Sequence, residues 1–207
     1  MTILDRITLL ITGLIAIYTI WRLYSRYSTS RKLYDLYYMM GFIVLLISGL
    51  LLIFLGWDIL SSPFVLTVAT LIPLGISMGL MNQYFPKWKK AYAWFALIGL
   101  IAIAITSVSG SDLKKIAVPV FHGIAGLIIF LAPIKLSLEK KAPQGFWWVG
   151  VGGALIGLGG IALAFLVSES QLLFFSQDLV MTILAPLLLM MTLAFGWGFT
   201  RQVLAGD

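Results

Sequence analysis

The sequence is poor in the residues that soluble domains and most active sites use. Only 11% of its 207 residues are charged, whereas a typical soluble domain carries about 25%. It contains no cysteine and a single histidine. The missing cysteines exclude disulfides, thiolate metal sites and cysteine nucleophiles. One histidine does not furnish the usual metal clusters or nucleophile triads, so we predict that the protein is not an enzyme and holds no metal cluster.

The chain is instead rich in long runs of hydrophobic residues. Hydrophobic residues make up 61% of it, and the mean hydropathy is +1.04. A surface this apolar requires lipid as its solvent, and spanning helices are the architecture that lipid permits. Apolar runs predict an all-α integral membrane protein with seven transmembrane helices in a single domain, 1–207. The predicted spans are 7–24, 37–56, 63–83, 91–108, 116–134, 147–167 and 179–199.

Charged residues are missing from the middle of every predicted span. Because intramembrane ionisable groups mark proton relays and ion pathways, their absence argues against a proton pump, a carboxylate-coupled transporter and an aspartyl or metal-dependent intramembrane protease. The last span has no lysine, which excludes the Schiff base of a retinal protein.

The basic residues predict the orientation of the chain. Eleven of the fourteen lysines and arginines follow the first, third, fifth and seventh spans, whereas Asp58, Asp112, Glu169 and Asp178 lie in the other loops. The positive-inside rule then places the N-terminus outside and the C-terminus in the cytoplasm. We expect a prokaryotic cytoplasmic membrane as the location. The net charge of +6 follows from this topology and predicts no nucleic-acid partner.

An internal duplication is a hypothesis that three segments support. Gly49–Leu55 resembles Gly160–Leu166, Val65–Leu74 resembles Val180–Leu187, and Ile11–Ile15 resembles Ile124–Ile128, at nearly constant offsets. Repeats over 7–84 and 116–199, joined by a linker helix at 91–108, would form a parallel 3+1+3 arrangement about an axis along the membrane normal. Chance similarity between leucine-rich helices is the alternative.

His122 is the candidate cofactor ligand. It lies in the fifth span beside Gly123, with Gly126 one turn later. A neutral imidazole supplies one axial bond to the metal of a tetrapyrrole such as haem or chlorophyll. The structural alternative is a hydrogen bond to a neighbouring helix.

Glycines at spacings of three and four residues follow one face of the sixth span. They are Gly150, Gly153, Gly157 and Gly160. Small residues at this spacing predict a helix-packing seam, because they let a second backbone approach closely. The same flat face suits a partner helix, a carotenoid or a lipid tail.

Prolines inside spans mark a candidate pocket or hinge. Pro73 and Pro186 occupy corresponding places in the two proposed repeats, with Thr70 and Thr182 beside them. Proline frees a backbone carbonyl and kinks a helix. The threonines are suited to satisfying such freed groups, or to lining a central pocket between the two kinked helices.

A basic and aromatic loop is predicted after the first span. It carries Arg22, Arg26, Arg31 and Lys32, interleaved with Tyr24, Tyr27 and Tyr34. Such a loop binds anionic lipid or an acidic surface. Alternatively, it only sets the topology.

Three classes of function fit these features. The first is a non-catalytic accessory or scaffold subunit of a larger respiratory or photosynthetic type of membrane complex, packed against partner helices, further copies of itself or a hydrophobic cofactor. The second is a parallel-repeat carrier for a small neutral substrate. The third is the input domain of a seven-helix membrane sensor. Lipid is the one partner common to all three.

Overall fold

The computed structural model describes residues 1–168 and 177–205, and all the regular secondary structure in them is helical. The helices are α1 (Ile3–Ser30), α2 (Leu33–Leu55), α3 (Pro63–Ala69), α4 (Leu71–Tyr84), α5 (Lys89–Val108), α6 (Lys114–Leu138), α7 (Trp147–Ser168) and α8 (Gln177–Ala205), with a short 3-10 helix η1 (Trp57–Ser61) after α2. The expectation of an all-α protein is confirmed. Glu169 lies outside the described residues, as do the side chains of 161–166 that enter the repeat alignment.

Six helical segments are long and apolar enough to cross a membrane, and they coincide with six of the seven predicted spans. They are α1, α2, the pair α3–α4, α5, α6 and Leu179–Arg201 of α8. The remaining predicted span, 147–167, coincides with α7, whose stretch Trp147–Gly160 is apolar but shorter. The chain is therefore an integral membrane protein by the length and composition of its helices.

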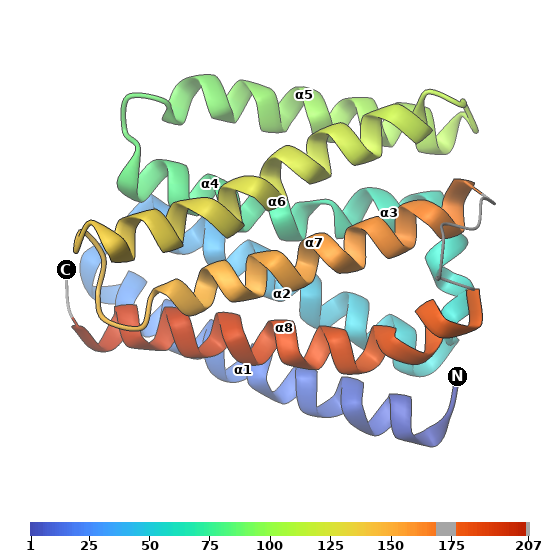
Figure 1. Ribbon diagram of the computed structural model, residues 1–207, viewed down its shortest axis with the longest axis horizontal. Helices are drawn as coiled ribbons and strands as arrows, with labels where there is room; N and C mark the ends of the chain where they lie inside the picture. The colour runs from blue at the N-terminus through green and yellow to red at the C-terminus, as the bar shows by residue number, and fades with distance from the viewer. Residues whose placement is uncertain (169–176, 206–207) are drawn as a thin grey trace.

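Successive long helices run in opposite directions along the bundle (Figure 1). The turn after α1, the segment between α4 and α5, the segment between α6 and α7 and the C-terminus of α8 lie together at one end, here called the basic end. The N-terminus, η1 and the turn between α5 and α6 lie at the opposite end, here called the η1 end. The segments in which lysines and arginines gather thus share one end of the bundle.

Six segments form a closed ring in which each packs on the next. Around the ring the order is α1, α2, α4, α6, α7, α8 and back to α1, while α5 packs outside it on α3, α4 and α6. If α1, α2 and α3–α4 are called the first trio and α6, α7 and α8 the second, exchanging the trios leaves these neighbour relations unchanged. Only α5 lacks a counterpart.

The third predicted span is broken in its middle. α3 ends at Ala69 and α4 begins at Leu71, with a turn at Thr70. Pro73 has no N–H group, so the carbonyl of Ala69 loses the hydrogen bond that a continuous helix would supply. The hydroxyl of Thr70 bonds to the carbonyl of Leu66 at 2.9 Å. α6 and α8, by contrast, continue through Pro119, Pro133 and Pro186.

The predicted basic loop after the first span is wrong as a free loop. α1 continues to Ser30 and α2 starts at Leu33, which leaves a two-residue turn. Arg26 points into the bundle, where its Nε donates to Oδ1 of Asp35 at 2.8 Å. The Arg26 side chain is 7% exposed and that of Asp35 is fully buried. The sequence predicts that both charged side chains lie in a solvent-exposed loop. They are instead buried between α1 and α2 at the basic end, which is possible because the two opposite charges neutralise each other.

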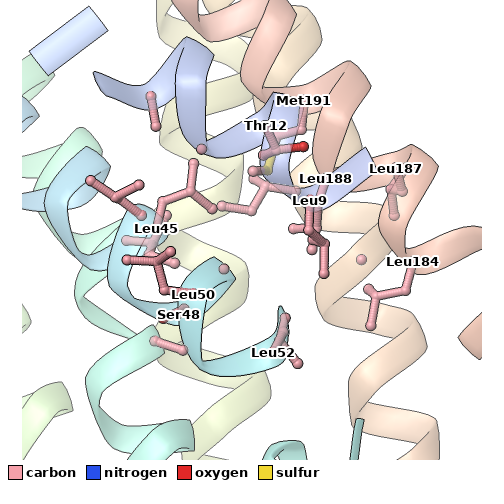
Figure 2. A pocket seen from close by; sticks show the side chains of 18 of the residues that line it. Leu9, Thr12, Leu45, Ser48, Leu50, Leu52, Leu184, Leu187, Leu188 and Met191 are labelled. Carbon is pink, nitrogen blue, oxygen red and sulfur yellow. The ribbon is translucent and has the colours of Figure 1, made fainter. Parts of the chain in front are cut away.

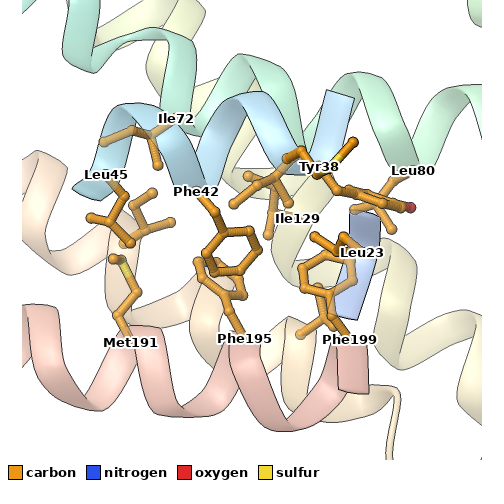
Figure 3. Packing of buried hydrophobic residues seen from close by; sticks show 14 of the residues in the cluster. Leu23, Tyr38, Phe42, Leu45, Ile72, Leu80, Ile129, Met191, Phe195 and Phe199 are labelled. Atoms are coloured by element: carbon orange, nitrogen blue, oxygen red, sulfur yellow. The ribbon is translucent and has the colours of Figure 1, made fainter. Parts of the chain in front are cut away.

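Aromatic side chains fill the half of the bundle next to the basic end (Figure 3). The Tyr38 and Phe199 rings have centroids 4.5 Å apart, and Phe42 meets Phe195 and Phe199 edge-on at 6.3 and 5.8 Å. All four residues are essentially fully buried. Since Tyr38 and Phe42 belong to α2 and the two phenylalanines to α8, these contacts join the two trios. We call these four residues the aromatic seal.

Candidate functional site

A cavity of about 180 Å³ lies between the two trios in the half of the bundle nearest the η1 end. All six segments of the ring line it, with Leu9 and Thr12 from α1, Leu45 and Leu52 from α2, and Leu184, Leu187 and Leu188 from α8 among the residues (Figure 2). Leu45 and Met191 border both the cavity and the packed half. The aromatic seal therefore closes the cavity on its basic side.

The cavity wall is almost entirely aliphatic. Among the described residues that line it, the polar side chains are Thr12, Ser48 and His122, and none is acidic, lysine or arginine. The Thr12 hydroxyl donates to the carbonyl of Thr8 at 2.8 Å, which leaves it only acceptor capacity. Such a wall favours an uncharged, apolar occupant.

Small residues create the space. Gly13, Gly49, Gly159, Gly160 and Ala16 all line the cavity. A Cβ added at Gly49 would meet no atom within 4 Å, and one at Gly13 would meet only Leu46 at 3.4 Å. The four glycines supply no side chain to fill the space between the trios, and Ala16 supplies only a methyl group. In the packed half, the rings of the aromatic seal fill the space between the trios. Gly13 and Gly49 are visible in the sequence within the proposed repeat segments, but their spacing alone does not predict a cavity.

The cavity reaches the membrane-facing surface of the bundle. Leu10 and Leu14 of α1 and Leu50 of α2 line it although 53%, 58% and 42% of each is exposed. At this depth the exposed faces of α1 and α2 lie against hydrocarbon. The wall of the cavity on the side of α1 and α2 is therefore formed by residues that also reach the outer surface of the bundle.

η1 covers the cavity at its other end. Leu60 of η1 lines the wall, and Trp57, Ile59 and Leu60 pack against a small buried cluster of Leu9, Leu52 and Ala185. Apolar side chains of η1 thus form the cover of the cavity at this end.

His122 is the one predicted site residue with an unused polar group in the cavity wall. Its Nδ1 is buried and has no hydrogen-bond partner among the described residues. On the other edge of the ring, Cδ2 and Nε2 lie 3.2 and 3.5 Å from where a Cβ on Gly160 would stand. Gly160 therefore makes room for the imidazole. Nδ1 is enclosed by protein, whereas the Cδ2–Nε2 edge lies beside Gly160, which lines the cavity, so Nε2 is the ring nitrogen placed nearest to the open space.

Two glycines of the predicted seam face α6 within the chain. A Cβ at Gly150 would lie 2.8 Å from the carbonyl oxygen of Phe130, and one at Gly153 would lie 2.6 Å from backbone atoms of Ile129 and Phe130. A Cβ at Gly157 would meet nothing within 4 Å. This part of the seam is occupied by the chain's own α6, so a partner helix does not use it.

The two proline–threonine pairs lie in different surroundings. Pro73 lines the cavity, whereas Pro186 and Thr182 are exposed and do not. Thr70 is fully buried, and its hydroxyl is used within its own helix. The structure therefore brings Pro73 and His122 to one cavity and leaves Pro186 and Thr182 on the outer face of α8.

The volume of the cavity tests the predicted cofactors. A cavity of roughly 150 Å³ holds benzene, so 180 Å³ accommodates one six-membered ring. A tetrapyrrole contains four pyrrole rings in a macrocycle and does not fit beside His122. A carotenoid is much longer than one ring, so this cavity would hold only a terminal ring of such a molecule. Within the described residues there is also no group of three or more His, Asp or Glu side chains that could hold a metal ion.

Comparison with protein-family models, curated proteins and solved structures finds no match to this chain.

Proposed function

We propose that the protein is a non-catalytic membrane subunit that holds a small, uncharged, lipid-soluble molecule in the cavity between its two helix trios. It is inserted in a prokaryotic cytoplasmic membrane with the η1 end outside and the basic end in the cytoplasm. The observation that carries the proposal is the cavity itself, which has an aliphatic wall, a side formed by membrane-facing residues and a single imidazole.

The wall of the cavity argues against a carrier for polar solutes. A sugar-like substrate would leave its hydrogen bonds with water and find only Thr12, Ser48 and His122 as side-chain partners. Each hydroxyl buried without a partner costs a few kcal/mol. An apolar molecule pays no such cost, and it reaches the cavity from the bilayer without being carried. Holding the ligand, as a cofactor-bearing subunit does, is thus the better-supported role.

The neighbour relations around the ring support the internal repeat. Exchanging α1, α2 and α3–α4 with α6, α7 and α8 preserves every contact of the ring, and α5 is the segment left over. This is the arrangement expected for parallel repeats joined by a linker helix. The cavity then lies between the trios, close to the pseudo-twofold axis.

An exposed aromatic pair on α1 favours a partner subunit. The centroids of Tyr18 and Trp21 lie 6.0 Å apart, and 47% and 60% of the two residues are exposed. Aromatic side chains are enriched where protein surfaces meet, because they bury a large area and carry a polar group for a partner. We propose that this part of α1, nearer the basic end than Leu10 and Leu14, packs against another helix of a larger complex.

Purification from the native membrane in mild detergent tests both parts of the proposal. The particle is expected to be heavier than one or two copies of the chain, and solvent extraction followed by mass spectrometry is expected to recover one apolar compound in stoichiometric amount. A bare chain without bound compound would contradict the proposal.

A matched pair of variants locates the compound. Gly49→Leu adds a side chain to the cavity wall, whereas Gly123→Leu adds the same side chain on the exposed face of α6, where nothing lies within 4 Å. We expect the first variant to lose the compound and the second to keep it. Retention by both variants would place the compound elsewhere.

A further inference from the structure

We propose that the ligand presents a single six-membered ring bearing one carbonyl or hydroxyl group, and that His122 binds this group. The inference rests on the proposed function and narrows the ligand of the same cavity to a chemical class. It joins the volume of the cavity to the one imidazole in its wall.

The volume sets the size of the buried part. A space of about 180 Å³ is slightly larger than a cavity that takes benzene, at roughly 150 Å³. One ring with one or two small substituents fills it, whereas a fused-ring system does not. Aliphatic side chains surround the site, and they suit both faces of a flat ring.

His122 sets the polar group. In apolar surroundings a charged imidazole is costly, so the ring is neutral and offers one donor and one acceptor nitrogen. Nε2, on the ring edge beside the cavity-lining Gly160, is the nitrogen that a ligand in the cavity can meet. A neutral imidazole bonds equally to a carbonyl, through its N–H, and to a hydroxyl, through its bare nitrogen. One carbonyl or hydroxyl group on the ligand is therefore enough to form a hydrogen bond with His122.

The exposed part of the cavity wall, on α1 and α2, indicates that the ring of the ligand can bear a long substituent. Because exposed Leu10, Leu14 and Leu50 line the cavity, a substituent on the ring can leave toward the acyl chains. A ring attached to an apolar tail, dissolved in the bilayer, is the molecule that this geometry admits.

The site is asymmetric although the trios are proposed repeats. By the offset that aligns Gly13 with Gly126, the counterpart of His122 is Leu9. Both residues line the cavity. At this pair of corresponding positions one trio therefore supplies an apolar side chain and the other an imidazole, which gives the ring one preferred orientation.

The absence of cysteine makes a direct binding test possible in lipid nanodiscs. Leu188→Cys places a thiol in the cavity wall, and Met190→Cys places one on the exposed face of the same helix. Labelling by N-ethylmaleimide is followed with phenol or toluene, rings of nearly equal size of which only phenol carries a hydroxyl. Concentrations are compared in the membrane phase, and the Met190→Cys variant corrects for effects of the probes on the bilayer.

Phenol is expected to protect the thiol of Leu188→Cys at a concentration about five-fold below that of toluene, which is the range of one neutral hydrogen bond. In a His122→Leu background the two probes should protect equally, whereas His122→Gln should retain part of the preference. Equal protection with His122 present, or a phenol preference that survives His122→Leu, would overturn the inference. The comparison with His122 present decides the matter even where His122→Leu does not fold.

The two proposals fail differently in this test. If neither probe slows labelling of the Leu188→Cys variant more than that of Met190→Cys, the cavity binds no small apolar molecule and the proposed function fails. If both probes protect equally well, the cavity binds rings and only the role of His122 is wrong.

Discussion

The two halves of the bundle differ in how the same helices fill the space between them. Near the basic end, Tyr38, Phe42, Phe195 and Phe199 interlock across the two trios (Figure 3). Near the η1 end, glycines and short aliphatic side chains of the same helices leave a cavity of about 180 Å³. An unfilled space forgoes dispersion contacts that a packed core gains. The packed half thus stabilises the trio interface, while the hollow half gives up stability for a binding site.

We expect the largest loss of stability from changes in the packed half. The first target is the ion pair between Arg26 and Asp35 at the basic end. Asp35→Ala leaves the buried guanidinium of Arg26 without its carboxylate. Removing one partner of a buried pair costs about 4 kcal/mol. Unfolding of the purified protein in detergent by a denaturing surfactant measures the loss. The double variant Arg26→Met with Asp35→Leu is expected to be nearer to the wild type, and a single variant of unchanged stability would show that the pair does not close this end.

A substitution in the aromatic seal tests the difference in packing between the two halves of the bundle. Phe199→Ala removes a fully buried ring that contacts Tyr38, Phe42, Phe146 and Phe195, at an expected cost of roughly 3 kcal/mol. The matched change in the hollow half is Leu184→Ala, where the side chain already borders open space. There we expect about 2 kcal/mol, the low end of the range for a buried leucine. Equal losses in the same unfolding measurement would mean that the two halves are packed alike.

A smaller effect separates filled from open positions along one helix. Gly153→Ala drives a Cβ into the backbone of α6, whereas Gly157→Ala, four residues on, meets nothing within 4 Å. Overpacking of the first kind costs about 2 kcal/mol. The second substitution is expected to be neutral, or to stabilise by a few tenths of a kcal/mol because alanine favours the helix. Similar melting temperatures for the two variants would contradict the assignment of this face to α6.

Several structural features could be predicted from the sequence because they depend on local properties. The spans at 7–24, 37–56 and 91–108 follow from apolar length, and the structure has α1, α2 and α5 there. The glycine spacing in the sixth span indicated close packing, and Gly150 and Gly153 do contact a neighbouring backbone. The unusual position of His122 was also visible as the only histidine in an apolar stretch.

Other features could not be predicted because they depend on which face of a helix turns inward. Thr182 and Pro186 are exposed while Pro73 lines the cavity, although the sequence treats the two prolines as equivalents. In a soluble helix an apolar stripe would identify the inward face. Here lipid is as apolar as the core, so the stripe is absent. For the same reason the sequence did not predict that the Arg26 side chain points into the bundle, where Asp35 of the next helix stabilises it.

The sequence by itself determined that the chain is a bundle of apolar helices with its basic residues in alternate loops, because span length and charge placement are set by the bilayer residue by residue. Only the tertiary structure decided that aromatic rings fill one half while a cavity with His122 in its wall occupies the other. Packing depends on how side chains from α1, α2, α4, α6, α7 and α8 meet. No single stretch of sequence contains that information.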